Sequence, residues 1–285
     1  MPYAVSVNSS WPPGEHKVTV DVEFPKGQKL AQQTYTLTIV NPDYGKPPVD
    51  ADVEALKGQF AGSTVALLQQ GAPVPAWKVD KYGGTQDCEL HAPNAVPDRN
   101  LSAINFGGST LMQVGQYGMD HRTLVKFDLA QVPKTATVQK VLLKLQLRDG
   151  AALGLKAQRV LTSWAQGIGI GDLYDPKVGK IRDGEPSWDL RAFPKTAWGA
   201  PGCGKAGVDF DPKEVLSACT QAKTPNDKVA KAWVTWDLTE FAAIWVKTPE
   251  QNFGVVLLGH DPISNFRSSE YEDPIFRPKL IVVYK

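Results

Sequence analysis

From about Tyr82 onward, the chain is a long series of short strand-like segments separated by glycine, proline, asparagine and aspartate. Amphipathic helices of the kind that join parallel strands do not interrupt this series. Strands joined by short turns pair antiparallel, whereas parallel pairing needs a crossover of a dozen or more residues. The pattern therefore predicts an all-β fold over residues 81–285, an antiparallel jelly-roll β-sandwich.

Residues 1–43 show the same pattern of short strands and turns but are too few to form a sandwich. Three alternating segments lie between residues 3 and 40, separated by turns. An immunoglobulin-like domain has about seven strands. We therefore interpret residues 1–43 as a partial immunoglobulin-like β segment of a longer modular protein, with docking onto the following domain as the alternative. Residues 44–80 are expected to be a linker, with a short helix over 50–59.

Charge, hydropathy and cysteine content restrict the classes of partner. The 31 basic and 30 acidic side chains leave a net charge of +1, which gives no general attraction for nucleic acid. No apolar run approaches the ~20 residues of a spanning helix, so no membrane insertion is expected. Of the three cysteines, Cys203 and Cys219 are the easier pair to bridge, and none has metal-ligand spacing.

A series of short motifs carries a family resemblance, and RTLVKFDL at residues 122–129 is the most recognisable of them. The others are NFGG at 105–108, LMQVG at 111–115, the stretch 138–147, SW at 163–164, PSW at 186–188, WDLT at 236–239, Trp245, NFG at 252–254, FRSSE at 266–270 and RPKL at 277–280. In this order they resemble the DNRLRE-type domain, a bacterial and archaeal extracellular jelly-roll module of which some members bind alginate.

The resemblance implies a non-catalytic carbohydrate-binding module of a secreted or surface multidomain protein. Its location would be extracellular or at the cell surface, and other domains of a longer parent chain would be its partners. Gln166 stands where family members often carry glutamate, and Ser187 where threonine is common. These departures leave the identity of the polysaccharide open.

Alternation along two strands independently predicts a basic surface. In the strand 121–128, Arg122 and Lys126 lie opposite to Val125 and Phe127. In the strand 138–148, valine and leucine alternate inward, and the outward candidates for binding are Lys140, Lys144, Gln146 and Arg148. If the two strands are neighbours, as sequential strands often are, these side chains form one face.

The local charge supports this basic face. Eight lysines and arginines outnumber three acids between residues 120 and 160, a net charge of +5. Several such cations would bind an acidic polysaccharide through many weak contacts. The alternative is that they are ordinary solubilising charges of an exposed sheet, with Arg122 paired structurally to Glu270.

Aromatic side chains are the second expected component of a sugar site, because their rings stack on the apolar faces of sugars. The candidates in loop-rich sequence are Tyr117, Trp164, Tyr174, Trp188 and Trp198. Structural packing is the alternative for the tryptophans among them. Trp236 and Trp245 are expected in the core, because one alternates with core residues and the other lies in a helix-like segment.

No catalytic signature is found in the sequence. The four histidines lack zinc-ligand spacing, and no serine or cysteine nucleophile motif is present. The segment 199–206 resembles a phosphate-binding loop but lacks its serine or threonine. Acidic pairs such as Asp209 with Asp211 could serve a glycosidase only if opposed across a cleft. The chain is therefore predicted not to be an enzyme.

No cofactor is expected, although loops with Asp172 and Asp175 could hold a structural Ca²⁺, and any other metal site is unknown at this point. Two hypotheses follow. The first is a carbohydrate-binding module for an acidic polysaccharide such as alginate. The second is a structural or adhesive β-sandwich that mediates protein–protein assembly at the cell surface.

Overall fold

The computed structural model describes residues 14–23, 29–39, 50–93, 104–170, 180–260 and 262–285. The chain divides into two compact units, residues 1–49 and residues 50–285. In the smaller unit, β1 (Gly14–Glu23) and β2 (Lys29–Ile39) form an antiparallel hairpin. They confirm two of the three expected strands, and the third, residues 3–7, lies outside the described residues. The immunoglobulin-like interpretation stays a prediction.

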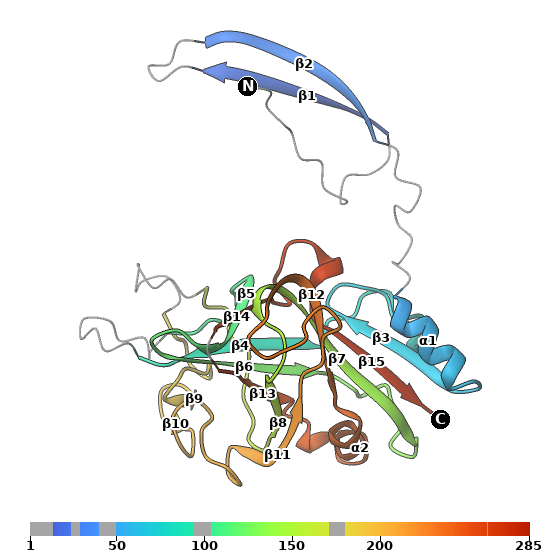
Figure 1. The fold of residues 1–285 in the computed structure, drawn as a ribbon, viewed down its shortest axis with the longest axis vertical. Coiled ribbons are helices and arrows are strands. Elements are labelled where there is room, and N and C mark those ends of the chain that lie inside the picture. Colours follow the sequence, from blue (N-terminus) through green and yellow to red (C-terminus); the bar gives the residue numbers. More distant parts are fainter. Residues whose placement is uncertain (1–13, 24–28, 40–49, 94–103, 171–179, 261) are drawn as a thin grey trace. The chain divides into compact units, whose positions relative to one another are not determined.

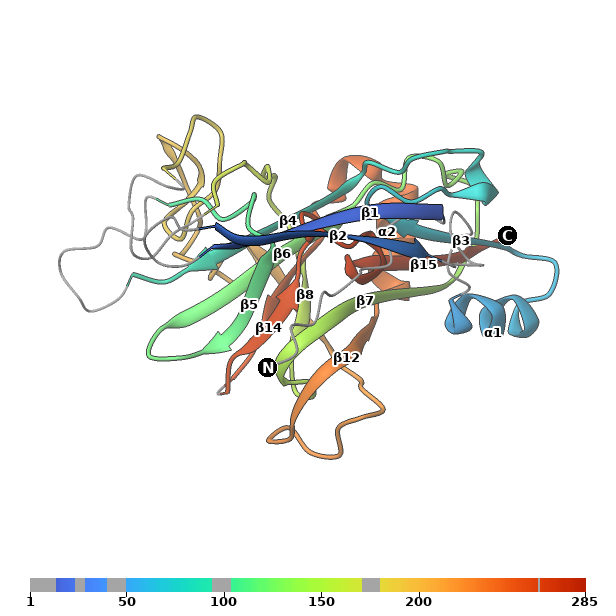
Figure 2. The same ribbon diagram turned by 90° about the horizontal axis from the view of Figure 1, so that it is seen from above.

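The larger unit is an antiparallel sheet that curls into a sandwich, which confirms the predicted all-β class (Figures 1 and 2). Its main strands are β3 (Thr64–Gln69), β4 (Thr85–His91), β5 (Leu111–Gln116), β6 (Asp120–Phe127), β7 (Val138–Ala151), β8 (Lys156–Val160), β11 (Phe210–Leu216), β12 (Lys228–Asp237), β13 (Val255–Leu258), β14 (Ser264–Arg267) and β15 (Lys279–Tyr284).

One half of the sandwich is arranged around β7, and we call it the β7 half. β12 pairs along one edge of β7. β15 and β14 pair with successive stretches of the other edge, so the sheet divides there into two branches. β3 continues the β15 branch and β5 continues the β14 branch. In Figure 2, β5, β14, β7 and β12 can be followed in this order.

The other half is arranged around β6, and we call it the β6 half. β4 pairs with one edge of β6 and β13 with the other, and β8 and β11 follow beyond β13. The end of β5 pairs with the start of β6, so β5 connects the two halves. β6 and β7 are therefore not neighbours, because β5 and β14 lie between them.

The main core lies between the halves and follows the pleat of the strands. Val141, Leu143, Leu145 and Leu147 all point into it from β7, as their alternation predicts. Trp236 of β12 is fully buried there, and Trp245 is buried on α2 (Thr239–Lys247), so both tryptophans are in the core as expected.

α1 (Ala51–Gln59) confirms the expected helix and belongs to the sandwich unit. Its Leu56 packs against Ile281 and Val283 on the outward face of β15, beside Val53 and Phe60. The segment 44–80 was expected to be a linker. Its part from Asp50 onward instead supplies α1 and the edge strand β3, and the compact unit begins at Asp50 rather than at residue 81.

A second apolar layer covers the outward face of the β6 half. It joins Leu124 to tryptophans of the 160–210 region, where β9 (Leu190–Ala192) and β10 (Thr196–Ala197) form a small hairpin. Cys203 lies in this layer, whereas Cys219 packs against the main core, and all three cysteines are free. The guess of a Cys203–Cys219 bridge is therefore wrong, because the two thiols belong to different layers. None of the described helices is both long and apolar enough to span a bilayer.

Candidate functional site

The outward face of the β7 half carries four of the predicted binding residues. Lys140, Lys144, Gln146 and Arg148 alternate with the core residues of β7 and point away from the core, as predicted. Trp233 of β12, Asn265 and Arg267 of β14, and Gln113 of β5 join this face from the paired strands. We call it the β7 outer face.

One end of the β7 outer face is neutralised by the N-terminus of α1. Lys144 forms ion pairs with Asp50 and Asp52, and Lys279 Nζ lies 3.1 Å from Asp50 Oδ2. Both ammonium groups also lie over the ring of Trp233, 5.5 and 4.5 Å from its centroid. Burial alone would raise the pKa of Asp50, but these ion pairs outweigh it and hold the pKa below its ordinary value. Lys144 is therefore a buried, paired cation rather than a free binding group.

Arg267 holds the other end of the β7 outer face. Its guanidinium donates to Gln146 Oε1 and lies against two aromatic rings that also contact each other, 4.8 Å from the centroid of Tyr271 and 5.0 Å from that of Phe276. Its Nε is buried and has no hydrogen-bond acceptor among the described residues. Arg267 forms no ion pair within the described residues, although its charge contributes to lowering the pKa of the nearby Asp149.

Polar side chains surround Arg267 and are fixed to one another. Arg148, half exposed, lies 2.6 Å from Asp149 Oδ2, and Asn265 donates to the other oxygen of Asp149. Gln113 in turn donates to Asn265 Oδ1. Burial tends to raise the pKa of Asp149, but hydrogen bonds from Arg148 and Asn265 lower it below its ordinary value. The result is a hydrogen-bonded strip of amides, cations and one carboxylate on rigid strands.

The single basic face predicted from β6 and β7 is not formed. Arg122 and Lys126 lie on the β6 half, on the far side of β5 and β14 from Lys144. Arg122 stacks over Trp188, donates to the Gly202 carbonyl and lies 3.7 Å from Asp120. These contacts favour the structural alternative, although its carboxylate neighbour is Asp120 and not the predicted Glu270.

The predicted aromatic platforms are mostly buried. Trp164 and Trp188 both belong to the layer over the β6 half, where the indole N–H of Trp164 donates to the Phe253 carbonyl. Trp198 is buried in the same layer, and Tyr174 lies outside the described residues. Tyr117 is 77% exposed in the β5–β6 turn and remains available for contact with a ligand.

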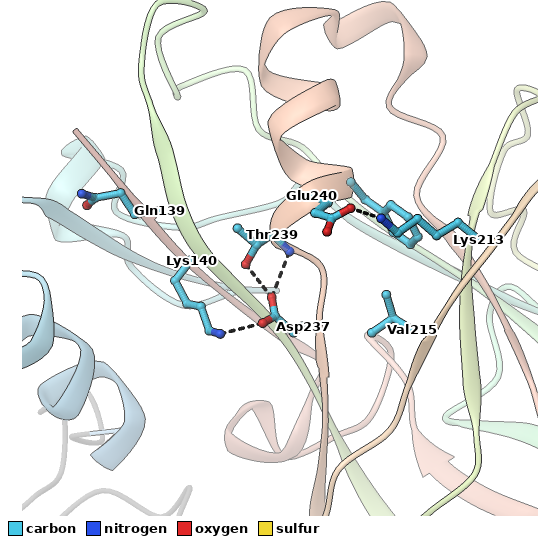
Figure 3. Close-up of a pocket in the computed structure, with 8 residues that line it drawn as sticks. Gln139, Lys140, Lys213, Val215, Asp237, Thr239 and Glu240 are labelled. Carbon is cyan, nitrogen blue, oxygen red and sulfur yellow. Dashed lines mark hydrogen bonds and ion pairs between the residues drawn. The ribbon is translucent and has the colours of Figure 1, made fainter.

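Lys140 lines a cavity of about 380 Å³ between β7, β11 and α2 (Figure 3). Its ammonium lies 2.6 Å from Asp237, which also accepts hydrogen bonds from Thr239. Lys213 pairs with Glu240 on the opposite wall. Each lysine ammonium at this cavity therefore has a carboxylate partner. Through Asp237, the interactions with Lys140 and Thr239 connect β7 to the start of α2.

The acidic residues considered for catalysis have structural partners. Asp209 is buried and accepts backbone hydrogen bonds from Gly199, Ala200 and Lys205, which shapes that loop. Asp211 lies 2.8 Å from Arg159. The candidates for a structural Ca²⁺, Asp172 and Asp175, lie outside the described residues.

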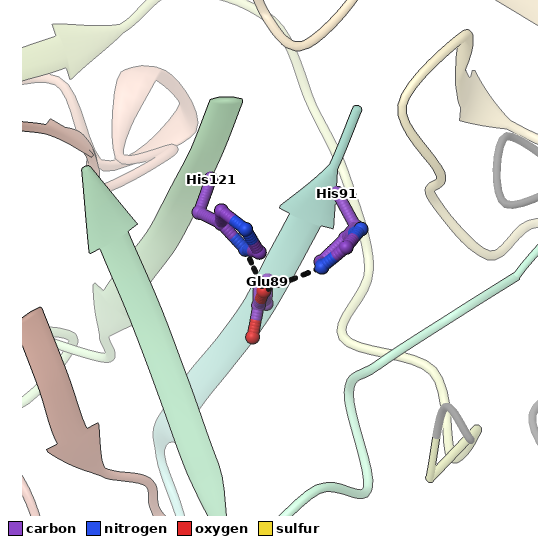
Figure 4. Close-up of side chains that lie close together, drawn as sticks. All are labelled: Glu89, His91 and His121. Atoms are coloured by element: carbon purple, nitrogen blue, oxygen red, sulfur yellow. Dashed lines mark hydrogen bonds and ion pairs between the residues drawn. The ribbon is translucent and has the colours of Figure 1, made fainter. Parts of the chain in front are cut away.

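A buried cluster of one glutamate and two histidines lies between the halves, and the sequence reasoning missed it (Figure 4). Glu89 and His91 are two residues apart on β4, so they share a face, and His121 of β6 is paired directly with His91. His121 Nδ1 lies 2.8 Å from Glu89 Oε1, and His91 Nε2 lies 3.8 Å from the same oxygen. Glu-x-His on one strand, with a histidine on a second strand, was the signal available in the sequence.

Burial dominates the protonation of this cluster. It lowers the pKa of His91 to about 3, with His121 adding to the effect, so His91 is neutral at physiological pH. Burial also raises the pKa of Glu89, although the hydrogen bond from His121 opposes this. A groove of about 420 Å³ reaches Glu89 and His91 from the surface, between β4, β5 and the 106–110 loop.

No family model matches the chain, and no curated protein matches it.

Proposed function

We propose that the chain is a non-catalytic carbohydrate-binding module of a secreted or surface multidomain protein, and that it binds an acidic polysaccharide such as alginate. The β7 outer face around Arg267 is the binding surface in this proposal. It replaces the wider basic surface expected from β6 and β7, since Lys140 and Lys144 have carboxylate partners.

The observation that carries the proposal is the guanidinium of Arg267. It forms no ion pair among the described residues, it is partly buried, and it lies against the rings of Tyr271 and Phe276. Arginine binds carboxylates through paired hydrogen bonds, and such charge-assisted bonds are stronger than neutral ones. A uronate carboxylate could accept hydrogen bonds from the Arg267 guanidinium while the sugar ring contacts Tyr271 or Trp233.

The neighbouring side chains extend the surface along the strands. Arg148 is exposed although it pairs with Asp149, and the partly exposed Gln113 has an amide oxygen that could accept from a sugar hydroxyl, while the buried Asn265 holds Gln113 in place. Strand residues two apart repeat at about 7 Å, so a linear polymer lying along the sheet could make several contacts at once. Repeated weak contacts add through multivalency.

Native affinity electrophoresis of the full chain tests the proposal. Gels containing alginate, pectate or a neutral glucan would be compared, and we expect retardation by the acidic polymers that weakens as salt is raised. Arg267→Gln should weaken binding to alginate about five- to tenfold, which corresponds to about 1–1.4 kcal/mol.

Lys134→Gln is the matched control, because it removes the same charge from an exposed position in the turn before β7. An equal loss in both variants would mean that net charge alone causes the retardation. No retardation in any gel would overturn the proposal and favour the structural or adhesive module.

A further inference from the structure

The cluster of Glu89, His91 and His121 has no part in the proposed glycan surface. All three side chains are at least nine-tenths buried, and their nitrogen and oxygen donors lie within 4.8 Å of one another. Burying ionisable groups is costly unless they are paired or bind a metal. The hydrogen bond between Glu89 and His121 satisfies one pair, but His91 Nε2 remains 3.8 Å from the carboxylate, beyond hydrogen-bond distance.

We propose that Glu89, His91 and His121 bind a divalent transition-metal ion of the zinc class through one carboxylate oxygen and two imidazole nitrogens. Zinc takes these ligands at about 2.0–2.2 Å in tetrahedral geometry, which separates the donors by about 3.4 Å. The two distances to Glu89 Oε1, 2.8 and 3.8 Å, lie on either side of that separation. Small side-chain shifts therefore suffice to admit the ion (Figure 4).

The surroundings prepare the donors for a metal. The backbone N–H of Gln113 donates to Glu89 Oε2 at 3.2 Å, which orients the carboxylate and leaves Oε1 facing the histidines. Hydrogen bonds of this kind position metal ligands in known sites.

The ligand set selects the class of ion. Calcium requires six to eight oxygen ligands, and magnesium keeps an octahedral oxygen shell, so two imidazoles disfavour both. Imidazole with one carboxylate suits zinc and the neighbouring first-row metals. This site is therefore distinct in chemistry from the structural Ca²⁺ considered for Asp172 and Asp175.

The groove provides access and a free coordination position. It is lined by Phe106, Ser109, Leu111 and Ile170, and it ends at Glu89 and His91. Three protein ligands at the end of an open groove leave room for a water molecule or an oxygen of a ligand at the fourth position.

Isothermal titration of the chelator-treated full chain with Zn²⁺, and separately with Ca²⁺, tests the proposal. We expect one Zn²⁺ per chain and no comparable Ca²⁺ heat at these residues. In His91→Gln and in His121→Gln, Zn²⁺ affinity should fall at least a hundredfold. Co²⁺ offers a second readout, since a four-coordinate site gives intense visible absorption that the variants should lose.

The variants His16→Gln and His260→Gln are matched controls, because they remove histidines elsewhere in the chain and should leave Zn²⁺ binding unchanged. Thermal unfolding with and without Zn²⁺ distinguishes binding from misfolding: the folded wild type should gain thermal stability, and folded cluster variants should not. Absence of stoichiometric Zn²⁺ binding by the wild type would overturn the proposal, as would equal binding by a folded His121→Gln variant. Neither result depends on whether the chain binds a polysaccharide.

Discussion

Asp50 combines two structural roles in one side chain. Its Oδ1 accepts the backbone N–H of Asp52 and so caps α1, and its carboxylate pairs with Lys279 and Lys144. Aspartate and asparagine are about equally good helix caps. Replacing Asp50 by asparagine therefore removes the negative charge while it keeps the helix cap.

We predict that Asp50→Asn lowers the free energy of unfolding by about 1–3 kcal/mol at pH 7, since Lys279 loses its carboxylate while Lys144 keeps Asp52. The pKa of Asp50 is lowered in the folded chain, so its stabilisation is present above its ordinary value of 3.8 and is lost as pH falls through the folded-state pKa. The difference from wild type should therefore close below about pH 4. Urea unfolding at pH 3, 5 and 7 measures it.

Asp52→Asn is the control for this variant. Asp52 is about half exposed and pairs with Lys144 alone, so the loss should be smaller. A constant difference between wild type and Asp50→Asn at all three pH values would show that charge is not the cause.

At the scale of single elements, local pattern predicted β7 and α1 well. Val141, Leu143, Leu145 and Leu147 face the core as alternation requires, and Leu56 faces β15. The pairing of strands was harder to predict from the sequence, because the residues of one strand do not indicate which other strand it pairs with. The short connection between β6 and β7 suggested that they pair, yet β6 pairs with β4, β5 and β13, whereas β7 pairs with β12, β14 and β15 from the C-terminal part of the chain.

The candidate site could not be predicted for the same reason, since it depends on which strands pair. Arg267 is 119 residues beyond Arg148 in the sequence, and only the pairing of β14 with β7 brings them to one face. His91 and His121 likewise meet through the pairing of β4 with β6. The choice between platform and packing for Trp164 and Trp188 could not be made from the sequence, because loop-rich sequence does not reveal that the loops fold back over the sheet.

Helix α1 contributes to stability through its contact with β15. We predict that Leu56→Ala lowers the free energy of unfolding by about 2–3 kcal/mol, because it leaves a cavity against Ile281 and Val283. Chemical unfolding monitored by tryptophan fluorescence measures the change. Ala55→Ser, on the exposed side of the same helix, should change it by about 0.5 kcal/mol or less. Equal effects would contradict the packing role of α1.

At the scale of the whole molecule, the chain is two units, and the sandwich unit contains its own core. Among the described residues, the members of the main core come from the sandwich unit, including both halves and α2. A domain with its own core can fold independently.

We therefore predict that residues 50–285, expressed without residues 1–49, unfold with the same main transition temperature as the full chain, within about 2 °C. Differential scanning calorimetry of both chains makes the comparison. A substantially lower transition for the shorter chain would show that the first unit stabilises the sandwich.

The branching of the sheet at β7 has a consequence for the order in which the molecule opens. β7 is hydrogen-bonded to β12 on one side and to both β15 and β14 on the other. Its central amide protons can exchange with solvent only when β7 separates from the strands on its two edges, which requires most of the sheet to unfold. In deuterated buffer, these protons should be the last to exchange, at a rate governed by global unfolding, while those of the edge strands β3 and β11 exchange earlier.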